Sequence, residues 1–154
     1  MTAGNHHFQF LPALTPEYRG AVEALFFFNP RQWIVRDGIR ASVDRHGVPE
    51  IMERDGRIWI GVSSGTTQCL FACDRRLEPP RLAGVVVYSR PMPETLCITH
   101  LAVDPEYASD GGNGCEGGLG LILFMAVRQL ARRMKGVVHL QLPYRSRCYL
   151  PVSE

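Results

Sequence analysis

The residues best suited to chemistry in this chain form a glycine-rich run that opens into an apolar helix. The glycines are Gly111, Gly112, Gly114, Gly117, Gly118 and Gly120. A helix is expected to follow them, from about Leu119 to Met134. Glycine-rich backbone at a helix N-terminus presents free N–H groups and the positive end of the helix dipole to one point. The sequence therefore predicts a ligand that carries a phosphate or a pyrophosphate.

Three interpretations of this loop stay open. Gly112 to Gly117 matches the G-x-G-x-x-G pattern of dinucleotide-binding proteins, but the strand after the helix ends Gln141-Leu142-Pro143-Tyr144, without the acid that would hold a ribose. A P-loop is excluded, because no Gly-Lys-Ser/Thr follows the glycines. The other two interpretations are a surface loop without a ligand and a loop that holds a different phosphate compound.

The elements that must position this loop can be read from the periodicity of apolar residues. A strand is expected from Ile98 to Val103, stopped by Asp104-Pro105, and another from Val137 to Leu142 after the helix. Earlier elements are a strand at 8–14, helices at 15–28 and 32–44, and strands at 57–62, 68–73 and 82–89. This order predicts one domain over 1–154 of the α+β class: a mixed sheet with helices on both faces and one parallel βαβ unit near the C-terminus.

Three segments of the chain resemble the GNAT superfamily of acyl-CoA-dependent N-acyltransferases. Residues 81–87 resemble that family's third strand, and 100–107 its fourth strand with the following turn. Gly118-Leu119-Gly120 resembles the end of its Gln/Arg-x-x-Gly-x-Gly/Ala signature, whose Gln/Arg position falls here on Cys115. Residues 108–114 look like an insertion, so that the loop is longer than is usual in the family.

The resemblance implies a GNAT-like, mostly antiparallel sheet and acetyl-CoA or another acyl-CoA as the cofactor. Loop amides would hold the CoA pyrophosphate, and the pantetheine arm would pair with the strand before the loop like an added strand. The residues implied in cofactor binding are Leu101, Ala102, Val103, Cys115, Gly117, Gly118, Leu119 and Gly120. The implied activity is transfer of an acyl group, typically acetyl, to an amine of a small molecule or peptide. The alternative is a catalytically inactive CoA-binding or protein-interaction module.

Such a reaction needs a base for the ammonium proton, donors for the oxyanion and an acid for the leaving thiolate. The positions that best align with the family's base hold Cys97 and Thr99, and His100 is nearby and titrates in the right range. Strand alternation places His100 opposite Leu101 unless a bulge resets it, and a packed core histidine is the favoured interpretation. Tyr144 is the candidate acid, although its distance from the strand departs from the family pattern.

Bulk properties restrict the possible partners. A net charge of +2 gives no reason to expect a nucleic-acid partner, and no apolar run approaches the ~20 residues that would cross a membrane. The five cysteines are odd in number and form no C-x-x-C pair, which favours reduced thiols in the cytoplasm and argues against a zinc site.

Three further expectations concern packing. Residues 119–127 are apolar on all sides, which predicts a largely buried helix. The strand at 137–142 is expected to be an unpaired sheet edge, which would favour a homodimer. Phe26, Phe27, Phe28 and Trp33 could line an acceptor pocket, with at least two of the phenylalanines expected in the core.

Overall fold

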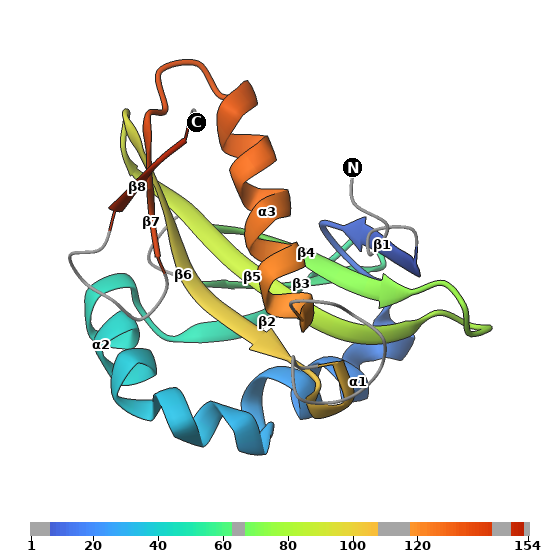
Figure 1. Ribbon diagram of the computed structural model, residues 1–154. Coiled ribbons are helices and arrows are strands. Elements are labelled where there is room, and N and C mark those ends of the chain that lie inside the picture. The colour runs from blue at the N-terminus through green and yellow to red at the C-terminus, as the bar shows by residue number, and fades with distance from the viewer. Residues whose placement is uncertain (1–6, 63–66, 108–117, 143–148, 153–154) are drawn as a thin grey trace.

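A computed structural model describes residues 7–62, 67–107, 118–142 and 149–152 of the chain (Figure 1). Six strands form one sheet in the order β1-β4-β5-β6-β7-β8. Their bounds are β1 Phe8–Leu11, β4 Thr67–Asp74, β5 Arg81–Met92, β6 Thr95–Val103, β7 His139–Gln141 and β8 Tyr149–Pro151. Neighbouring strands are antiparallel except β6 and β7, which are parallel.

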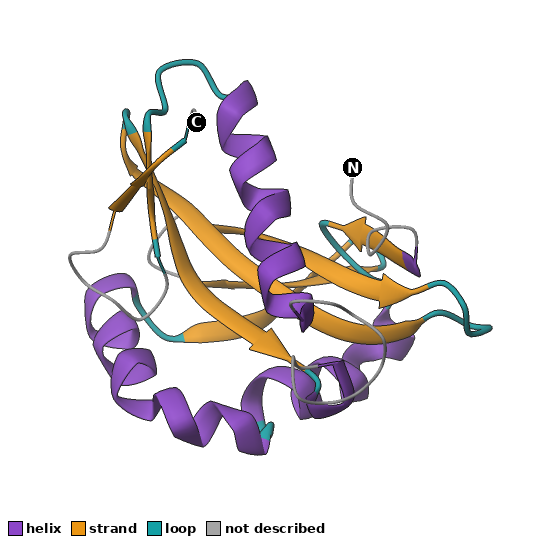
Figure 2. Cartoon of the chain, viewed as in Figure 1, coloured by secondary structure: helices purple, strands orange, loops and turns teal. Residues whose placement is uncertain are grey.

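The remaining elements pack on the two faces of this sheet. Between β1 and β4 lie the short helical turns η2 (Pro16–Tyr18), α1 (Arg19–Val22), η3 (Glu23–Phe27) and η4 (Pro30–Val35), then helix α2 (Arg36–His46) and a hairpin of β2 (Pro49–Arg54) and β3 (Arg57–Val62). Turn η5 (Pro105–Tyr107) follows β6, and helix α3 (Gly118–Arg133) connects β6 to β7. Figure 2 shows α3 crossing one face of the sheet.

Each face of the sheet has its own hydrophobic core. On one face, Leu119, Leu123 and Val127 of α3 pack against β5 and β6. On the other face, Phe26 of η3 and Ile60 of β3 pack against β4 and β5. The α+β class, the mixed and mostly antiparallel sheet, the helices on both faces and the parallel β6–α3–β7 unit are therefore confirmed.

Helix α3 is tied to the sheet at both ends. A Cβ at Gly84 of β5 would lie 2.9 Å from Leu119 Cδ2 and 3.0 Å from Leu123 Cδ1, so glycine lets the helix approach the sheet closely. Near the other end, the Arg90 guanidinium donates to the Lys135 carbonyl at 2.7 Å. The position of α3 over the sheet is fixed by these contacts.

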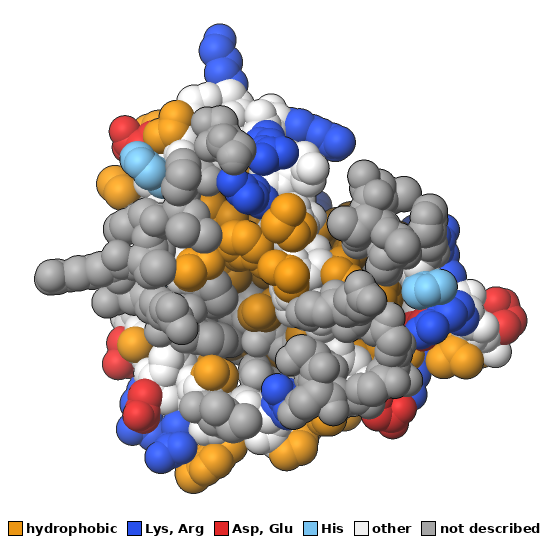
Figure 3. All heavy atoms as spheres, in the orientation of Figure 1, with side chains coloured by type: hydrophobic (Ala, Val, Ile, Leu, Met, Phe, Trp, Pro, Cys, Tyr) orange, Lys and Arg blue, Asp and Glu red, His pale blue; other side chains and the backbone are white. Residues whose placement is uncertain are grey.

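The burial of α3 differs from the sequence expectation. Leu121 is 52% exposed and Met125 is 39% exposed, while the buried residues lie on the side that faces the sheet. Figure 3 shows apolar side chains gathered over the middle of this face of the molecule. The expected burial of residues 119–127 holds except at Leu121 and Met125, which lie on the side of α3 away from the sheet.

The strands differ from the expectations in two respects. The strand after α3 is no sheet edge, because β8 pairs antiparallel with all three residues of β7. The premise for a homodimer through β7 is thereby lost. Strand β2 was missed because its sequence, PEIMER, is half charged, although the Asp55-Gly56 turn that joins it to β3 is typical of two-residue hairpins.

Among the described residues, none of the helices combines the length and the apolar character needed to cross a membrane.

Candidate functional site

The parallel strands β6 and β7 part after three residues. Thr95, Leu96 and Cys97 pair with His139, Leu140 and Gln141, in that order. β6 then continues to Val103, and no other described strand pairs with residues 98–103 on that side. In Figure 1 the two strands lie together at one end and diverge toward the end where α3 begins. The sheet therefore has an opening along one edge of β6.

A β-bulge lies at the start of this opening. Val87 of β5 pairs with His100 and Tyr88 pairs with Ile98, so Thr99 is the extra residue. The Thr99 hydroxyl donates to the Val87 carbonyl at 3.1 Å. The bulge resets the alternation of side chains: Ile98 and Leu101 both pack in the α3 core, although they are three residues apart.

The open edge of β6 presents backbone groups in a regular pattern. The Asp104 amide donates to Ala83 on β5 at 2.8 Å. Because amides alternate along a strand, the Ala102 amide also faces β5, whereas those of Leu101 and Val103 face the opening. Of the three β6 residues implied in cofactor binding, Leu101 and Val103 thus direct their N–H groups to the side of β6 that lies away from β5.

Two buried polar side chains replace a strand partner at the ends of this edge. Asn29 Nδ2 donates to the Val103 carbonyl at 2.8 Å, and Ser42 Oγ donates to the Thr99 carbonyl at 2.7 Å. Both side chains come from the helical segment 29–46 that packs behind the opening. They hold β6 in place where β7 does not reach.

The N-terminus of α3 lies beside the same opening. The helix begins at Gly118, which has a φ of +78°, a conformation that favours glycine. A Cβ on Gly120 would lie 3.8 Å from Leu101 and 3.9 Å from Val103, so the first turn of α3 rests on the open segment of β6. Cys115, Gly117 and Tyr144 lie outside the described residues.

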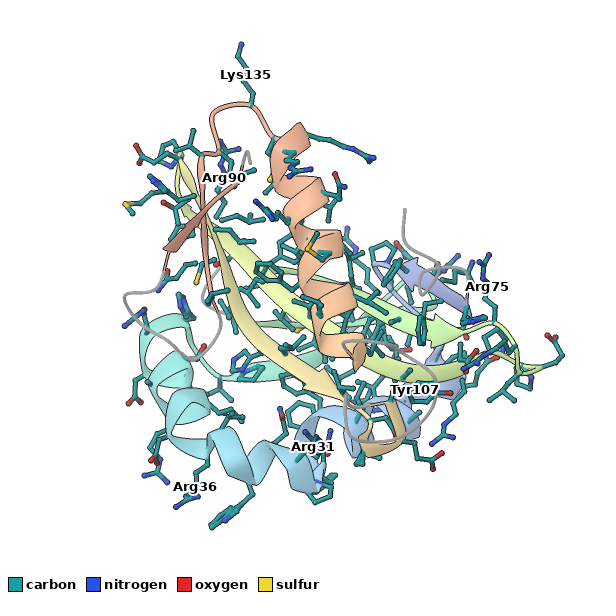
Figure 4. All side chains as sticks on the ribbon, viewed as in Figure 1. Arg31, Arg36, Arg75, Arg90, Tyr107 and Lys135 are labelled. Atoms are coloured by element: carbon teal, nitrogen blue, oxygen red, sulfur yellow. The ribbon has the colours of Figure 1, made fainter. Side chains whose placement is uncertain are left out.

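The chain just before the glycine-rich loop is firmly anchored. The buried Tyr107 hydroxyl donates to Asp74 Oδ2 at 2.7 Å, and Arg76 pairs with the same carboxylate at 2.8 Å. Hydrogen bonds from Arg76 are the main reason why the pKa of Asp74 lies well below its usual range. Figure 4 shows Tyr107 on the side of the molecule where α3 begins and Arg90 on the side where it ends.

A pocket of about 270 Å³ lies where the strands part. Cys97 and Ile98 of β6, Gln141 and Leu142 at the end of β7, and one side of α2 form its walls. The α2 residues are Asp37, Gly38, Ala41, Ser42, Arg45 and His46. The small side chains at 38, 41 and 42 leave the space, and charged groups lie at its mouth.

Within this pocket a thiol faces an imidazole. Cys97 Sγ lies 3.8 Å from His46 Nε2. Burial raises the pKa of the Cys97 thiol to about 11, which keeps it protonated at neutral pH. Burial and then the positive charge of Arg45 lower the pKa of His46, so its imidazole is neutral and able to accept a proton.

His100 lies in a different environment. It is 1% exposed, and its ring contacts the edge of Phe26 with the centroids 5.5 Å apart. Burial and then the nearby His46 lower the pKa of His100 to about 4. Its position on the Phe26 side of the sheet agrees with a packed core histidine, and a catalytic role for it stays a prediction.

The aromatic residues considered for an acceptor pocket are more exposed than expected. Only Phe26 of the three phenylalanines is buried, while Phe27 is 42% and Phe28 is 77% exposed. Phe27, Phe28 and Trp33 line a separate surface hollow beside α2. The expectation that at least two phenylalanines belong to the core was wrong, because the π-helical turn η3 directs its last residue and the following one outward.

Sequence reasoning missed His46, Ser42 and Asn29. Ser42 and Asn29 lie 57 and 74 residues from the β6 residues that they contact. No local pattern marks such distant contacts.

No family model matches the sequence, and no curated protein is similar enough to indicate a relative. The described residues contain no group of three or more His, Cys, Asp or Glu side chains that could hold a metal ion.

Proposed function

We propose that this protein is an acyl-CoA-dependent N-acyltransferase that moves a short acyl group, such as acetyl, to an amine of a small molecule or peptide. The single observation that carries the proposal is the parting of β6 and β7 beside the N-terminus of α3. A reducing, cytoplasmic compartment is part of the proposal, because acyl-CoA is an intracellular cofactor.

In the proposed complex, the pantetheine arm of CoA lies along the opening. The amide of Val103 would pair with an amide group of the pantetheine arm, which would continue the sheet as an added strand does. The positive end of α3 would lie next to the pyrophosphate, as expected for an anion at a helix N-terminus.

The thioester would then reach the pocket at the base of the opening. There the amine attacks the thioester carbonyl, a new C–N bond forms, and the C–S bond to CoA breaks. His46 is suited to accept the proton that the attacking nitrogen loses, because its imidazole lines the pocket and its pKa is lowered.

Calorimetry and thermal shift with acetyl-CoA, CoA and NAD test the proposal. We expect binding of both CoA species, none of NAD, and release of CoA thiol when an amine from a small-molecule and peptide panel is added with acetyl-CoA. The His46→Gln variant should bind acetyl-CoA like the native protein and turn over about 100-fold more slowly. Absence of CoA binding would refute the proposal.

A CoA-binding module without catalysis is the second candidate. The observation that favours it is that burial moves the pKa of both Cys97 and His100 away from neutrality, to about 11 and about 4. CoA binding without thiol release across the amine panel would support this second function.

A further inference from the structure

The proposed function does not require a thiol beside His46, yet the structure places one there. Cys97 is the last residue of β6 that pairs with β7, so its side chain stands where the opening begins. It lines the pocket and lies 3.8 Å from His46 Nε2, within the range of a hydrogen bond to sulfur. A base within reach of a thiol is the arrangement of an activated nucleophile.

The other two described cysteines show that burial alone does not create this arrangement. Cys73 of β4 is 1% exposed against 2% for Cys97, and burial raises the pKa of both thiols to about 11. Cys73 packs in the core behind β4, and the thiol of Cys69 donates to the Pro12 carbonyl. Cys97 differs from Cys73 in facing an imidazole and a pocket.

We infer that Cys97 accepts the acyl group from acyl-CoA and holds it as a thioester before the amine arrives. This inference rests on the proposed function and changes the order of its steps. The acyl group would be transferred twice, first from the CoA sulfur to Cys97 Sγ and then from Cys97 Sγ to the amine nitrogen.

The atoms balance without a further reactant. As Cys97 Sγ bonds to the thioester carbonyl carbon, its proton moves to His46 Nε2. The C–S bond to CoA then breaks, and the CoA sulfur takes the proton from His46. In the second half, the amine nitrogen bonds to the same carbon and gives a proton to His46. The Cys97 C–S bond breaks, and Sγ recovers the proton.

The location of His46 supports this proton transfer. It is the last residue of α2, and the negative end of a helix dipole stabilises a cation there. The imidazolium that forms during attack is therefore favoured by the helix, while a neutral imidazole is present beforehand. General-base activation during attack does not require the thiol to be ionised in the resting protein, as serine–histidine pairs demonstrate.

The test is the intact mass of the full-length protein after incubation with acetyl-CoA and no amine, quenched in acid. We expect the mass of one added acetyl group on the native protein and on Cys73→Ala, the matched control. Cys97→Ala should gain none, and His46→Gln should gain it about 100-fold more slowly. Fragmentation of the native adduct should place the acetyl group on Cys97.

Initial rates with the amine provide an independent readout. A two-step transfer predicts parallel double-reciprocal lines for acetyl-CoA and amine, and loss of turnover in Cys97→Ala and Cys97→Ser. The inference is overturned if the native protein shows no adduct, or if the Cys97→Ala variant keeps either the adduct or the turnover. CoA binding and amine-dependent thiol release in the native protein would then leave the proposed function standing, whereas their absence would refute both.

Discussion

The two edges of β6 differ in how completely they are paired. On one side, β5 follows β6 from Val103 back to Thr95, with irregularities at the Thr99 bulge and before Met92. On the other side, β7 pairs with three residues, and two side chains, Asn29 and Ser42, hold part of the rest. Exposed strand edges invite additional strands. An edge that pairs with no second described strand beyond Cys97, beside a helix N-terminus, is consistent with a site for an extended, anionic ligand.

Proline substitutions provide the strongest test of this difference. Ala102→Pro removes an N–H that faces β5 and should prevent folding or cost about 3 kcal/mol or more. Val103→Pro removes an N–H that faces the opening and should fold, with acetyl-CoA affinity about tenfold weaker. Thermal unfolding and calorimetry measure the two effects. Equal destabilisation by both prolines would contradict the assignment of the two edges.

The second test compares the stability of the protein at neutral and at acidic pH. The pKa of His100 is about 4 in the folded protein against an ordinary 6.5, so the unfolded chain binds more protons between these values. The contribution of neutral His100 is complete above pH 6.5 and decreases as the pH falls toward 4, by on the order of 3 kcal/mol. Urea unfolding at pH 7 and pH 4.5 measures this loss, which should shrink in His100→Leu.

Two neighbouring groups serve as controls for that titration. His46 also has a lowered pKa, so His46→Gln shows how much of the loss belongs to the pocket. The pKa of Asp74 is lowered from 3.8, so its contribution is lost below that value, outside the measured window. An unchanged loss in His100→Leu would show that His100 is already hydrated in the folded state.

Alanine substitutions at two glycines should change the stability by smaller amounts, with a loss at one position and no loss at the other. Gly84→Ala forces a methyl group against Leu119 and Leu123 and should cost about 1 to 3 kcal/mol. Gly120→Ala meets only ordinary contacts with Leu101 and Val103 and should be neutral or slightly stabilising, because alanine favours helices. Denaturant midpoints decide this prediction. A neutral Gly84→Ala would mean that α3 does not approach β5 as closely as described.

The smallest effects are expected at the two side chains that cap the open edge. Ser42→Ala and Asn29→Ala should each cost about 1 kcal/mol, since each leaves a β6 carbonyl without its donor. Ser42→Thr retains the hydroxyl and serves as the matched control. If both alanine variants melt like the native protein, these bonds do not support β6.

The sequence was sufficient to predict much of this arrangement. Helix α3 was placed at Leu119 to Met134 and is found at Gly118–Arg133, because a long apolar run after glycines is a strong local signal. Strand β6 was placed three residues short at its start, since Thr95 and Cys97 do not extend the apolar alternation clearly. The fold class followed from the order of such elements.

Contacts between distant segments could not be predicted in the same way. His46 meets Cys97 across 51 residues, and no local pattern in the sequence marks such a contact. The pairing of β8 with β7 could not be predicted either, because no strand was expected after residues 137–142. The sequence analysis considered a bulge in this strand, because a bulge could change the face on which His100 lies. The register of β5 with β6 shows that a bulge is present at Thr99.

The bulge at Thr99 has a consequence for the length of the chain. The apolar residues Leu96, Ile98, Leu101 and Val103 face α3 on both sides of the extra residue. Deleting Thr99 would restore strict alternation and leave each of them on its present face. The hydrophobic pattern would thus accept a chain that is one residue shorter. The extra residue is therefore not required by the hydrophobic pattern, and what its side chain does in this structure is to donate to the Val87 carbonyl where the opening begins.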